Sequence, residues 1–414
     1  MVRKWMVVFL IFNLFCCVAA KGQQDNDLWQ RDSITNGFFG LNSELEDSGV
    51  ELGFSLTQIY QQNLQGGLST HRRQGRHTGS YDLELAVDFE KLLGIKGGRL
   101  YMLTEGSWSR RDIDQTSVGS IFGVNGDFKG RRSMDVTELW YEQAFGDGLT
   151  VIFGKMDLTQ WFDTSAYAND ENTQFLNNAL INNPAIPFPD YGMGIVVSVT
   201  PMENWTISGA VADAQADIRE TGFNTAFHDE DFFFYIFEVA KASEVDFGRG
   251  PLAGSYRAGL WIDCQEKQQF SNGKNKRDDT GAYLSCDQMV YKESNDPADT
   301  QGLGVFGRYG YADSNLNEVT NLWSLGVQYE GLIDGRDADV LGFGFAQGFL
   351  SDSRGANGGI GYSEDYESVY ELYYNTKVTP WLEISPSLQY VVNPGGAGTA
   401  GDALILGARA FMVF

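Results

Sequence analysis

The stretch from Gly79 to Leu100 alternates strictly between apolar and polar side chains over its first half. One face would carry Tyr81, Leu83, Leu85, Val87 and Phe89, and the other Asp82, Glu84, Ala86, Asp88 and Glu90. A period of two residues is typical of a β-strand with one apolar and one polar face. Because burying unpaired carboxylates in a dry core is too costly, the polar face must contact water.

The apolar face of this strand has an aromatic residue at each end. Tyr81 and Phe89 are eight positions apart, which is roughly 26 Å along a strand at about 3.3 Å per residue. With a tilt of about 40° the span falls to about 20 Å, close to the apolar band of an outer-membrane barrel. An edge strand of a soluble sandwich would fit the same pattern, so other parts of the chain must decide.

The N-terminus has the features of a secretory signal peptide. Arg3 and Lys4 precede an apolar run, and Val18-Ala19-Ala20 is a small-residue cleavage site. In the following segment Ile34, Phe38, Leu41 and Leu45 recur at helical spacing and predict a short amphipathic helix. We expect a signal peptide over 1–20, a periplasmic segment over 21–49 and an outer-membrane barrel over 50–414.

From Val50 onward the chain reads as sixteen amphipathic strands, an even number as in bacterial single-chain barrels. No later apolar run is long enough for a membrane helix. The early connections alternate between long and short, as expected for external loops and periplasmic turns. Two further outward rows are Phe233, Tyr235, Phe237 and Val239, and Trp323, Leu325, Val327 and Tyr329. Such rows disfavour the sandwich. The predicted fold is an all-β transmembrane antiparallel β-barrel of about 16 strands with a short N-terminal periplasmic helix.

The charge balance and the cysteines restrict partners and compartment. With 30 basic and 55 acidic residues, the chain lacks a general electrostatic footprint for nucleic acid. After signal cleavage only Cys264 and Cys286 remain. An even pair in an exported protein favours a disulfide over a reactive site.

The histidines offer no catalytic arrangement. His71, His77 and His228 all fall in predicted loops, whereas a serine hydrolase in a barrel wall needs a histidine on a strand beside a serine. A metal site at His71 and His77 is weighed against a solvated basic loop, and Ca²⁺ at His228–Asp231 against a solvated acidic one. We expect no enzyme activity, no metal and no cofactor.

A barrel of this size can hold an aqueous channel whose selectivity comes from inward side chains. The connection from Thr159 to Tyr191 is the best candidate for a constriction, because its asparagine amides can bond hydroxyl groups and its rings can cover sugar C–H faces. The same loop folded outside the barrel is an equal alternative. The predicted constriction residues are Glu84, Glu138, Trp140, Glu142, Lys155, Trp161, Asp163, Asn177, Arg257 and Arg308.

Several stretches in a fixed order resemble the carbohydrate-selective porin family, OprB-like. They are Gly49–Gly67, Gly79–Gly98, Glu138–Phe145, Phe153–Asp157, Phe175–Pro184, Gly302–Gly310, Pro380–Gly396 and the terminal Phe414. The resemblance implies a sixteen-stranded outer-membrane porin through which sugars diffuse passively, with an inserted third external loop and opposed charges. It also implies that the barrel-insertion machinery reads the terminal Phe, although Arg409 stands where the usual signal has Gly.

The leading hypothesis is therefore a porin for neutral sugars in the lipid of a Gram-negative-type outer membrane. Arg257, Arg308 and Lys155 would oppose Glu84, Glu138 and Glu142 across the lumen. The alternative is a non-conducting barrel that acts as an adhesin or envelope anchor. A barrel lipase or protease is disfavoured by the histidines. The sequence does not distinguish a monomer from a homo-oligomer.

Overall fold

The computed structural model describes residues 27–71, 75–218, 230–248, 250–294, 296, 299–356, 361–396 and 398–414. The predicted signal peptide and His228 lie outside these ranges. Within them, no helix is long and apolar enough to cross a bilayer.

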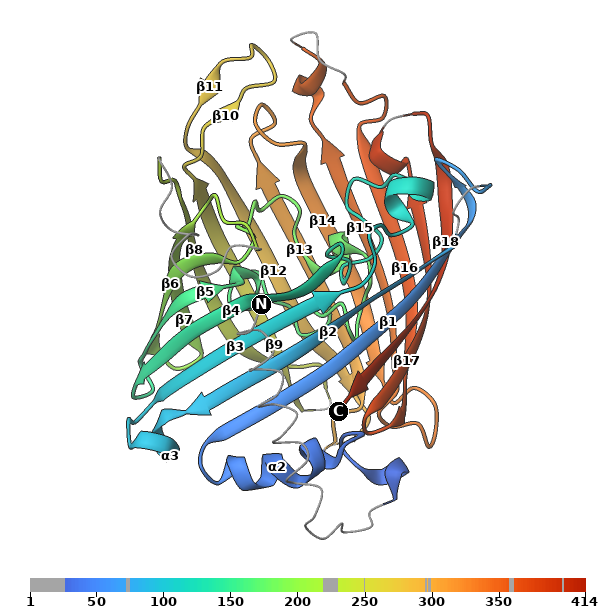
Figure 1. The fold of residues 1–414 in the computed structure, drawn as a ribbon. Coiled ribbons are helices and arrows are strands. Elements are labelled where there is room, and N and C mark those ends of the chain that lie inside the picture. Colours follow the sequence, from blue (N-terminus) through green and yellow to red (C-terminus); the bar gives the residue numbers. More distant parts are fainter. Residues whose placement is uncertain are drawn as a thin grey trace, which may run out of the picture.

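Sixteen antiparallel strands close into one barrel in which each strand pairs with its neighbours along the chain and β1 pairs with β18 (Figure 1). The barrel strands are β1 (Val50–Gly67), β2 (Gly75–Asp88), β3 (Gly98–Ser107), β4 (Arg132–Phe145), β5 (Leu149–Met156), β6 (Gly192–Met202), β7 (Trp205–Asp213), β8 (Phe233–Asp246), β9 (Pro251–Asp263), β12 (Asp279–Lys292), β13 (Gly302–Ala312), β14 (Val319–Glu330), β15 (Val340–Leu350), β16 (Tyr366–Thr379), β17 (Leu382–Val392) and β18 (Gly401–Val413). The predicted fold class is confirmed.

The remaining elements are short. A hairpin of β10 (Lys267–Gln268) and β11 (Asn275–Lys276) rises from the connection between β9 and β12. The α-helices are α2 (Asn36–Glu46), α3 (Phe89–Leu93) and α4 (Asn178–Ile181). Single turns of 3₁₀ or π helix occur at Leu28–Gln30, Asp114–Val118, Leu158–Gln160, Asp352–Gly355 and Pro394–Gly396.

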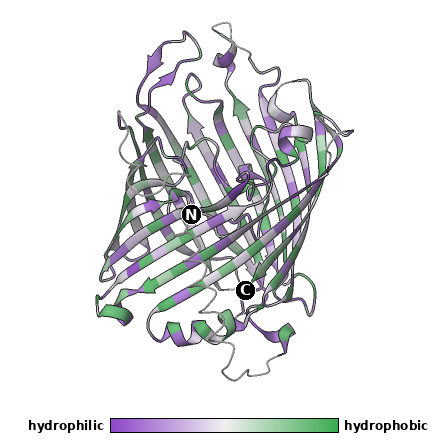
Figure 2. Ribbon diagram, in the orientation of Figure 1, coloured by the Kyte–Doolittle hydropathy of each residue, from purple (hydrophilic) through white to green (hydrophobic). Residues whose placement is uncertain are grey.

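The outer face of the wall is apolar, and the alternation of hydrophobic and hydrophilic positions is visible along the strands (Figure 2). On β8, Phe237 is 47% exposed whereas its neighbour Glu238 is 4% exposed. On β14, Leu325 is 46% exposed whereas Ser324 is 2% exposed. Both predicted outward rows are therefore assigned to the correct face. This surface is the one that lipid covers in a transmembrane barrel.

One predicted strand end is wrong, and two strands are longer than their apolar alternation indicates. β1 continues through polar residues to Gly67, and β2 starts at Gly75. At the other end of β2, Phe89 is the first residue of α3 and does not end the strand's apolar row. Apolar alternation detects only the part of a strand that faces lipid, so strands that extend past the bilayer appear too short from sequence.

The predicted N-terminal helix is confirmed as α2, which lies at the short-turn end of the barrel (Figure 1). Residues 37–40 have positive φ, so regular right-handed geometry begins only after Gly40. The Asn42 side chain forms two hydrogen bonds with the backbone of Leu52, at 2.7 and 3.2 Å. Because β18 pairs with β1 only from Ser55 onward, Asn42 satisfies backbone groups that the next strand leaves free.

The predicted disulfide is wrong, and Cys264 and Cys286 are free thiols. Cys286 on β12 pairs with Tyr256 on β9, whereas Cys264 directly follows Asp263, the last residue of β9. The two residues are thus about eight strand positions apart, roughly 26 Å at 3.3 Å per residue. A disulfide requires Cα atoms within about 7 Å.

Candidate channel lining and inserted loops

Two long connections fold into the barrel. We call residues 108–131, between β3 and β4, the first inserted loop, and residues 157–191, between β5 and β6, the second inserted loop. Their apolar side chains share one buried cluster with inward residues of the wall. The members from the loops include Ile113, Val118, Phe122, Val124, Phe175, Leu180 and Ile181, and those from the wall include Phe306, Leu322, Ala346, Val369, Val391 and Ile405.

Arg308 on β13 holds the second inserted loop from one side. Its guanidinium donates to the carbonyl oxygens of Leu180 and Asp163, at 2.7 and 3.1 Å, and to Oδ1 of Asn169, at 3.1 Å. Its Nε lies 3.6 Å from the Asp163 carboxylate, and both side chains are at most 3% exposed. A buried charge is tolerated only when it is paired and hydrogen-bonded, and these contacts supply both conditions.

Arg409 and Glu371 hold the same loop from the wall formed by β16 to β18. The Arg409 guanidinium donates to the carbonyl oxygens of Glu171 and Gln174, at 2.5 and 2.9 Å. The Glu371 carboxylate accepts from the backbone N–H groups of Leu176 and Asn177, both at 2.9 Å. All four bonds bind loop backbone, so they fix the path of the loop whatever side chains it carries.

Glycines on the inward face of β13 to β15 make room for the loop. A Cβ atom added at Gly344 would lie 2.8 Å from a Leu180 methyl group and 2.9 Å from the Phe175 ring. One added at Gly310 would lie 2.4 Å from the Asn183 side chain. The small residues therefore allow close packing between wall and loop, and any side chain there would displace the loop.

The first inserted loop is bonded mainly to the β1–β2 side of the wall. Gln61 donates to the Val124 carbonyl at 2.7 Å, and Ser80 donates to the Asp127 carboxylate at 2.5 Å. Burial raises the pKa of Asp127 to about 8, despite the opposing hydrogen bond from Ser80 and the charge of Lys129. Its second oxygen is buried without a hydrogen-bond partner, which is the environment of a protonated carboxyl group.

Lys129 joins the two inserted loops to β3. Its ammonium lies 2.6 Å from Glu105 on β3, and 4.0 Å from Glu171 on the second inserted loop. It also donates to the Tyr191 hydroxyl at 3.0 Å. Burial lowers the pKa of Lys129, but Tyr191, Glu105 and Glu171 outweigh that effect and hold the pKa well above its usual value. The residue is therefore a permanent cation between the loops and the wall.

The inward face of β2 to β4 carries carboxylates and stacked aromatic rings. Trp140 stacks on Tyr101 with ring centroids 5.0 Å apart. Trp161 of the second inserted loop contacts the Trp140 ring edge-on, with centroids 5.7 Å apart. Glu138 accepts from the Trp140 indole N–H at 3.0 Å and from Gln160 at 2.6 Å. Four inward side chains of this wall retain solvent exposure: Glu84, Arg99, Tyr101 and Glu142.

Residues 72–414 match the model of the carbohydrate-selective porin, OprB family. The chain belongs to this family. Porin B of Pseudomonas aeruginosa is 25% identical over 96% of this chain and 93% of its own length. The putative porin QuiX of Acinetobacter baylyi is 23% identical over 92% of this chain and 93% of its own. The high-pH structure of Pseudomonas putida OprB covers 93% of this chain and 99% of its own, with 21% identity and a TM-score of 0.80.

The predicted constriction residues of this porin separate into two groups. One group lies on or against the β2–β4 wall and comprises Glu84, Glu138, Trp140, Glu142 and Trp161. The other belongs to the contacts that hold the second inserted loop and comprises Asp163, Asn177, Arg257 and Arg308. Asn177 caps α4 and bonds Gln389 at 3.2 Å. Arg257 pairs with Asp287 at 2.9 Å, and the Asp287 carboxylate accepts a hydrogen bond from Ser165 of the loop at 2.5 Å.

Lys155 lies near the end of β5 and is 4% exposed. Its ladder partners are Leu139 and Met193. Its ammonium donates to the Ile218 carbonyl at 2.9 Å. The field across the lumen, with Arg257, Arg308 and Lys155 opposing Glu84, Glu138 and Glu142, stays a prediction.

Several anchoring residues were not predicted as site residues from the sequence. Arg409, Glu371 and Gln389 are all at most 2% exposed and all bond an inserted loop. A signal existed, because strand alternation places each of them on the inward face among small or apolar neighbours. Charged residues at such positions need water or a polar partner, and an inserted segment is one source of such a partner.

Proposed function

We propose that this porin lets carbohydrates diffuse passively through a water-filled lumen that the second inserted loop narrows. The observation that carries the proposal is the set of buried contacts by which Arg308, Arg409 and Glu371 hold the loop backbone inside the barrel. A loop held at four or more points across the lumen restricts the free cross-section permanently. Selection by size is the expected result.

The lining of the β2–β4 wall supports neutral sugars as permeants. Tyr101, Trp140 and Trp161 present ring surfaces, which suit the C–H faces of a pyranose. Glu84 on β2 and Glu142 on β4, both on the inward face of this wall, are hydrogen-bond acceptors for hydroxyl groups. Together they provide the apolar and polar contacts that a sugar can exchange for water as it moves.

Liposome swelling with a mono-, a di- and a trisaccharide tests this function. We expect the purified protein to admit the smaller sugars faster than the trisaccharide. Trp161→Ala should weaken this size discrimination, because it removes a ring from the loop where it meets the wall. Trp323→Ala is the matched control, since Trp323 lies on the outer face and should leave permeation unchanged. Failure of the wild-type protein to admit any sugar would refute the proposal.

A non-conducting barrel is the second candidate, and one observation favours it. The two inserted loops and the wall share a buried apolar cluster of 20 residues, as a plug would. Planar-bilayer recording separates the two functions, because a plugged barrel gives no open-channel steps whereas a narrowed channel gives discrete ones.

A further inference from the structure

A groove with a volume of about 680 Å³ lies in the lipid-facing surface of the barrel, between β8 and β14. We call it the outer groove. Three of the residues that line it are small: Ala258, Cys286 and Gly307. Cys286 on β12 and Gly307 on β13 are paired in the ladder. Larger outward side chains around them are at least 41% exposed: Tyr256, Leu284, Tyr309 and Leu325. The wall is therefore hollowed at a place where its neighbours extend toward lipid.

Within the described residues, no side chain fills the floor of the outer groove at Gly307. A Cβ atom added there would have the Cys286 sulfur, at 3.5 Å, as its nearest neighbour. By contrast, one added at Gly344 on the inward face would lie 2.8 Å from Leu180. A loop of the chain covers the inward glycine, whereas the floor at Gly307 is open to what surrounds the barrel. In a transmembrane barrel that surrounding is lipid.

Lys241 on β8 lies at the edge of the outer groove and faces outward. It has the same strand phase as Phe237 and Val239, and its ladder partners are Trp205 on β7 and Tyr256 on β9. Its ammonium lies 5.4 Å from the centre of the Trp205 ring, and it pairs with no carboxylate in the described part of the chain. A lysine on the lipid-facing surface is costly at the bilayer midplane but nearly free of cost at the interface.

Trp205 places Lys241 at the periplasmic boundary of the membrane. Trp205 is the first residue of β7 and follows the short turn after Met202, at the barrel end that carries the short turns (Figure 1). Tryptophan and tyrosine gather where a barrel meets the polar headgroups, and Trp205 and Tyr256 flank Lys241. The Lys241 ammonium is therefore at the level of the headgroups of the periplasmic leaflet.

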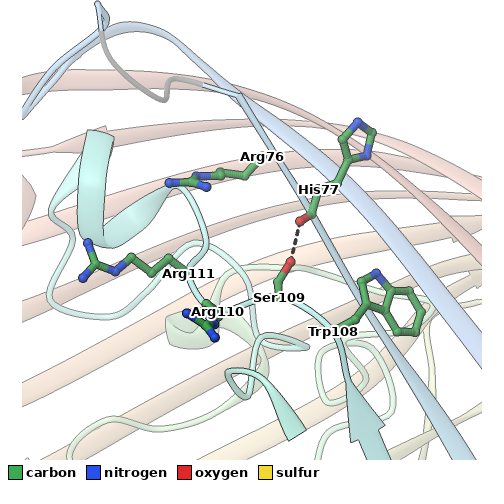
Figure 3. A pocket seen from close by; sticks show the side chains of 6 residues that line it. All are labelled: Arg76, His77, Trp108, Ser109, Arg110 and Arg111. Atoms are coloured by element: carbon green, nitrogen blue, oxygen red, sulfur yellow. Dashed lines mark hydrogen bonds between the residues drawn. The ribbon is translucent and has the colours of Figure 1, made fainter. Parts of the chain in front are cut away.

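The basic side chains near the opposite end of the barrel do not have this access to lipid. Arg76 lies on the inward face of β2, and Arg110 and Arg111 belong to the first inserted loop. They line a cavity of about 700 Å³, in which Arg76 and Arg111 extend to the opposite side from the Trp108 ring (Figure 3). The Trp108 ring covers Gly79 on the outward face. These arginines are therefore not directed at lipid, whereas Lys241 is.

We propose that the outer groove binds a glycerophospholipid of the periplasmic leaflet, with its phosphate on Lys241 and an acyl chain over Cys286 and Gly307. The Lys241 ammonium is a point charge that attracts a phosphate group. The small residues of the floor allow an acyl chain to approach the backbone of the wall. A second copy of this chain, seated on the same groove by two-fold symmetry, would instead bring two unpaired Lys241 ammonium groups to one interface.

The test is native mass spectrometry of the full-length mature protein in detergent, with added phosphatidylglycerol that carries palmitoyl and oleoyl chains. We expect the wild type to bind diacylglycerol with the same chains roughly fivefold or more weakly, because it lacks the phosphate. Lys241→Gln should weaken the binding of phosphatidylglycerol by a similar factor. Gly307→Leu, which fills the floor of the outer groove, should weaken the binding of both lipids.

Two matched controls should bind phosphatidylglycerol as the wild type does. Lys377→Gln removes another lysine near the short-turn end, and this lysine already lies 4.0 Å from the Glu383 carboxylate. Gly209→Leu adds the same side chain at an outward glycine of β7 outside the groove, where a Cβ atom would have no neighbour closer than 3.8 Å. Heat-dependent gel mobility of each variant checks that the barrel has formed.

Three results would overturn the proposal. Wild-type affinity in Lys241→Gln, or equal binding of diacylglycerol and phosphatidylglycerol, would show that Lys241 does not recognise the phosphate. Wild-type affinity in Gly307→Leu would show that the acyl chain lies elsewhere. A dimer that Gly307→Leu dissociates and added phosphatidylglycerol leaves intact would assign the outer groove to a second copy of this chain.

Discussion

The two halves of the barrel interior differ in what their charged residues do. On the β2–β4 side, Glu84, Arg99 and Glu142 keep solvent exposure and surround stacked aromatic rings. On the β13–β18 side, Arg308, Arg409 and Glu371 are at most 4% exposed and bond the backbone of the second inserted loop. Inward charges on the barrel strands therefore either keep solvent exposure, as Glu84 does, or bond an inserted loop, as Arg308 does and as Glu138 does on the β2–β4 side.

The difference shows that strand alternation identifies inward residues but does not show whether an inward charge faces water or bonds an inserted loop. Both groups of charges occupy the same inward phase of their strands. Only the inserted loops distinguish them, because a charge covered by a loop must be paired and a charge facing the lumen remains hydrated. Selectivity of this porin should thus depend on the β2–β4 side, and the size of its aperture on the β13–β18 side, which holds the second inserted loop.

The largest effect is expected for substitutions that exchange the two faces of β2. Leu85→Arg should impair barrel assembly, because a cation at the lipid midplane costs roughly 2–4 kcal/mol. Glu84→Gln, one position away on the inward face, should assemble normally and alter only ion or sugar selectivity. Heat-dependent gel mobility and single-channel recording measure the two outcomes. Equal damage by both substitutions would contradict the assignment of faces.

An intermediate effect on stability is expected on the β13–β18 side, where the wall packs against the second inserted loop. Gly344→Ala places a methyl group 2.8 Å from Leu180 and 2.9 Å from Phe175, and overpacking of this kind costs roughly 1–3 kcal/mol. Gly307→Ala is the control, because its nearest neighbour would be the Cys286 sulfur at an ordinary 3.5 Å. Denaturant unfolding should show a loss of stability for the first variant alone. A loss of the same size in both would mean that the loop does not press on this wall.

The smallest effect concerns pH and the first inserted loop. The pKa of Asp127 is raised from 3.8 to about 8 by burial, so the folded state binds an extra proton between these values. Stability should therefore fall as the pH rises through this window. Asp127→Asn should reduce the fall in unfolding temperature between pH 5 and pH 8, whereas Asp147→Asn in the exposed β4–β5 turn should not. An unchanged pH profile in Asp127→Asn would show that this carboxyl group is ionised throughout.

Much of the wall could be predicted from the sequence, because each strand must present apolar side chains to lipid at every second position. The rows on β8 and β14 show this directly. The same rule failed beyond the bilayer, where β1 and β2 continue through polar residues, and at Phe89, where α3 begins. The free cysteines could not be foreseen either, because their separation depends on strand register and not on their number.

The channel interior was less predictable because its contacts are distant in sequence. Arg308 bonds Leu180 across 128 positions, and Arg409 bonds Gln174 across 235. No local pattern reports such pairings. The insertion of the second loop was one of two equal alternatives. The inward glycines Gly310 and Gly344 were a usable signal, because they leave room for another segment inside the barrel.

Single-channel conductance of Arg308→Leu tests most directly whether the clamped loop sets the aperture. The substitution removes three hydrogen bonds to the loop and leaves Asp163 buried without its cation, a change that typically costs 3–5 kcal/mol. Arg336→Leu is the control, since Arg336 pairs with Asp339 in the β14–β15 connection. We predict a larger conductance for Arg308→Leu and the wild-type value for Arg336→Leu. A correctly folded Arg308→Leu channel with wild-type conductance would contradict the clamp.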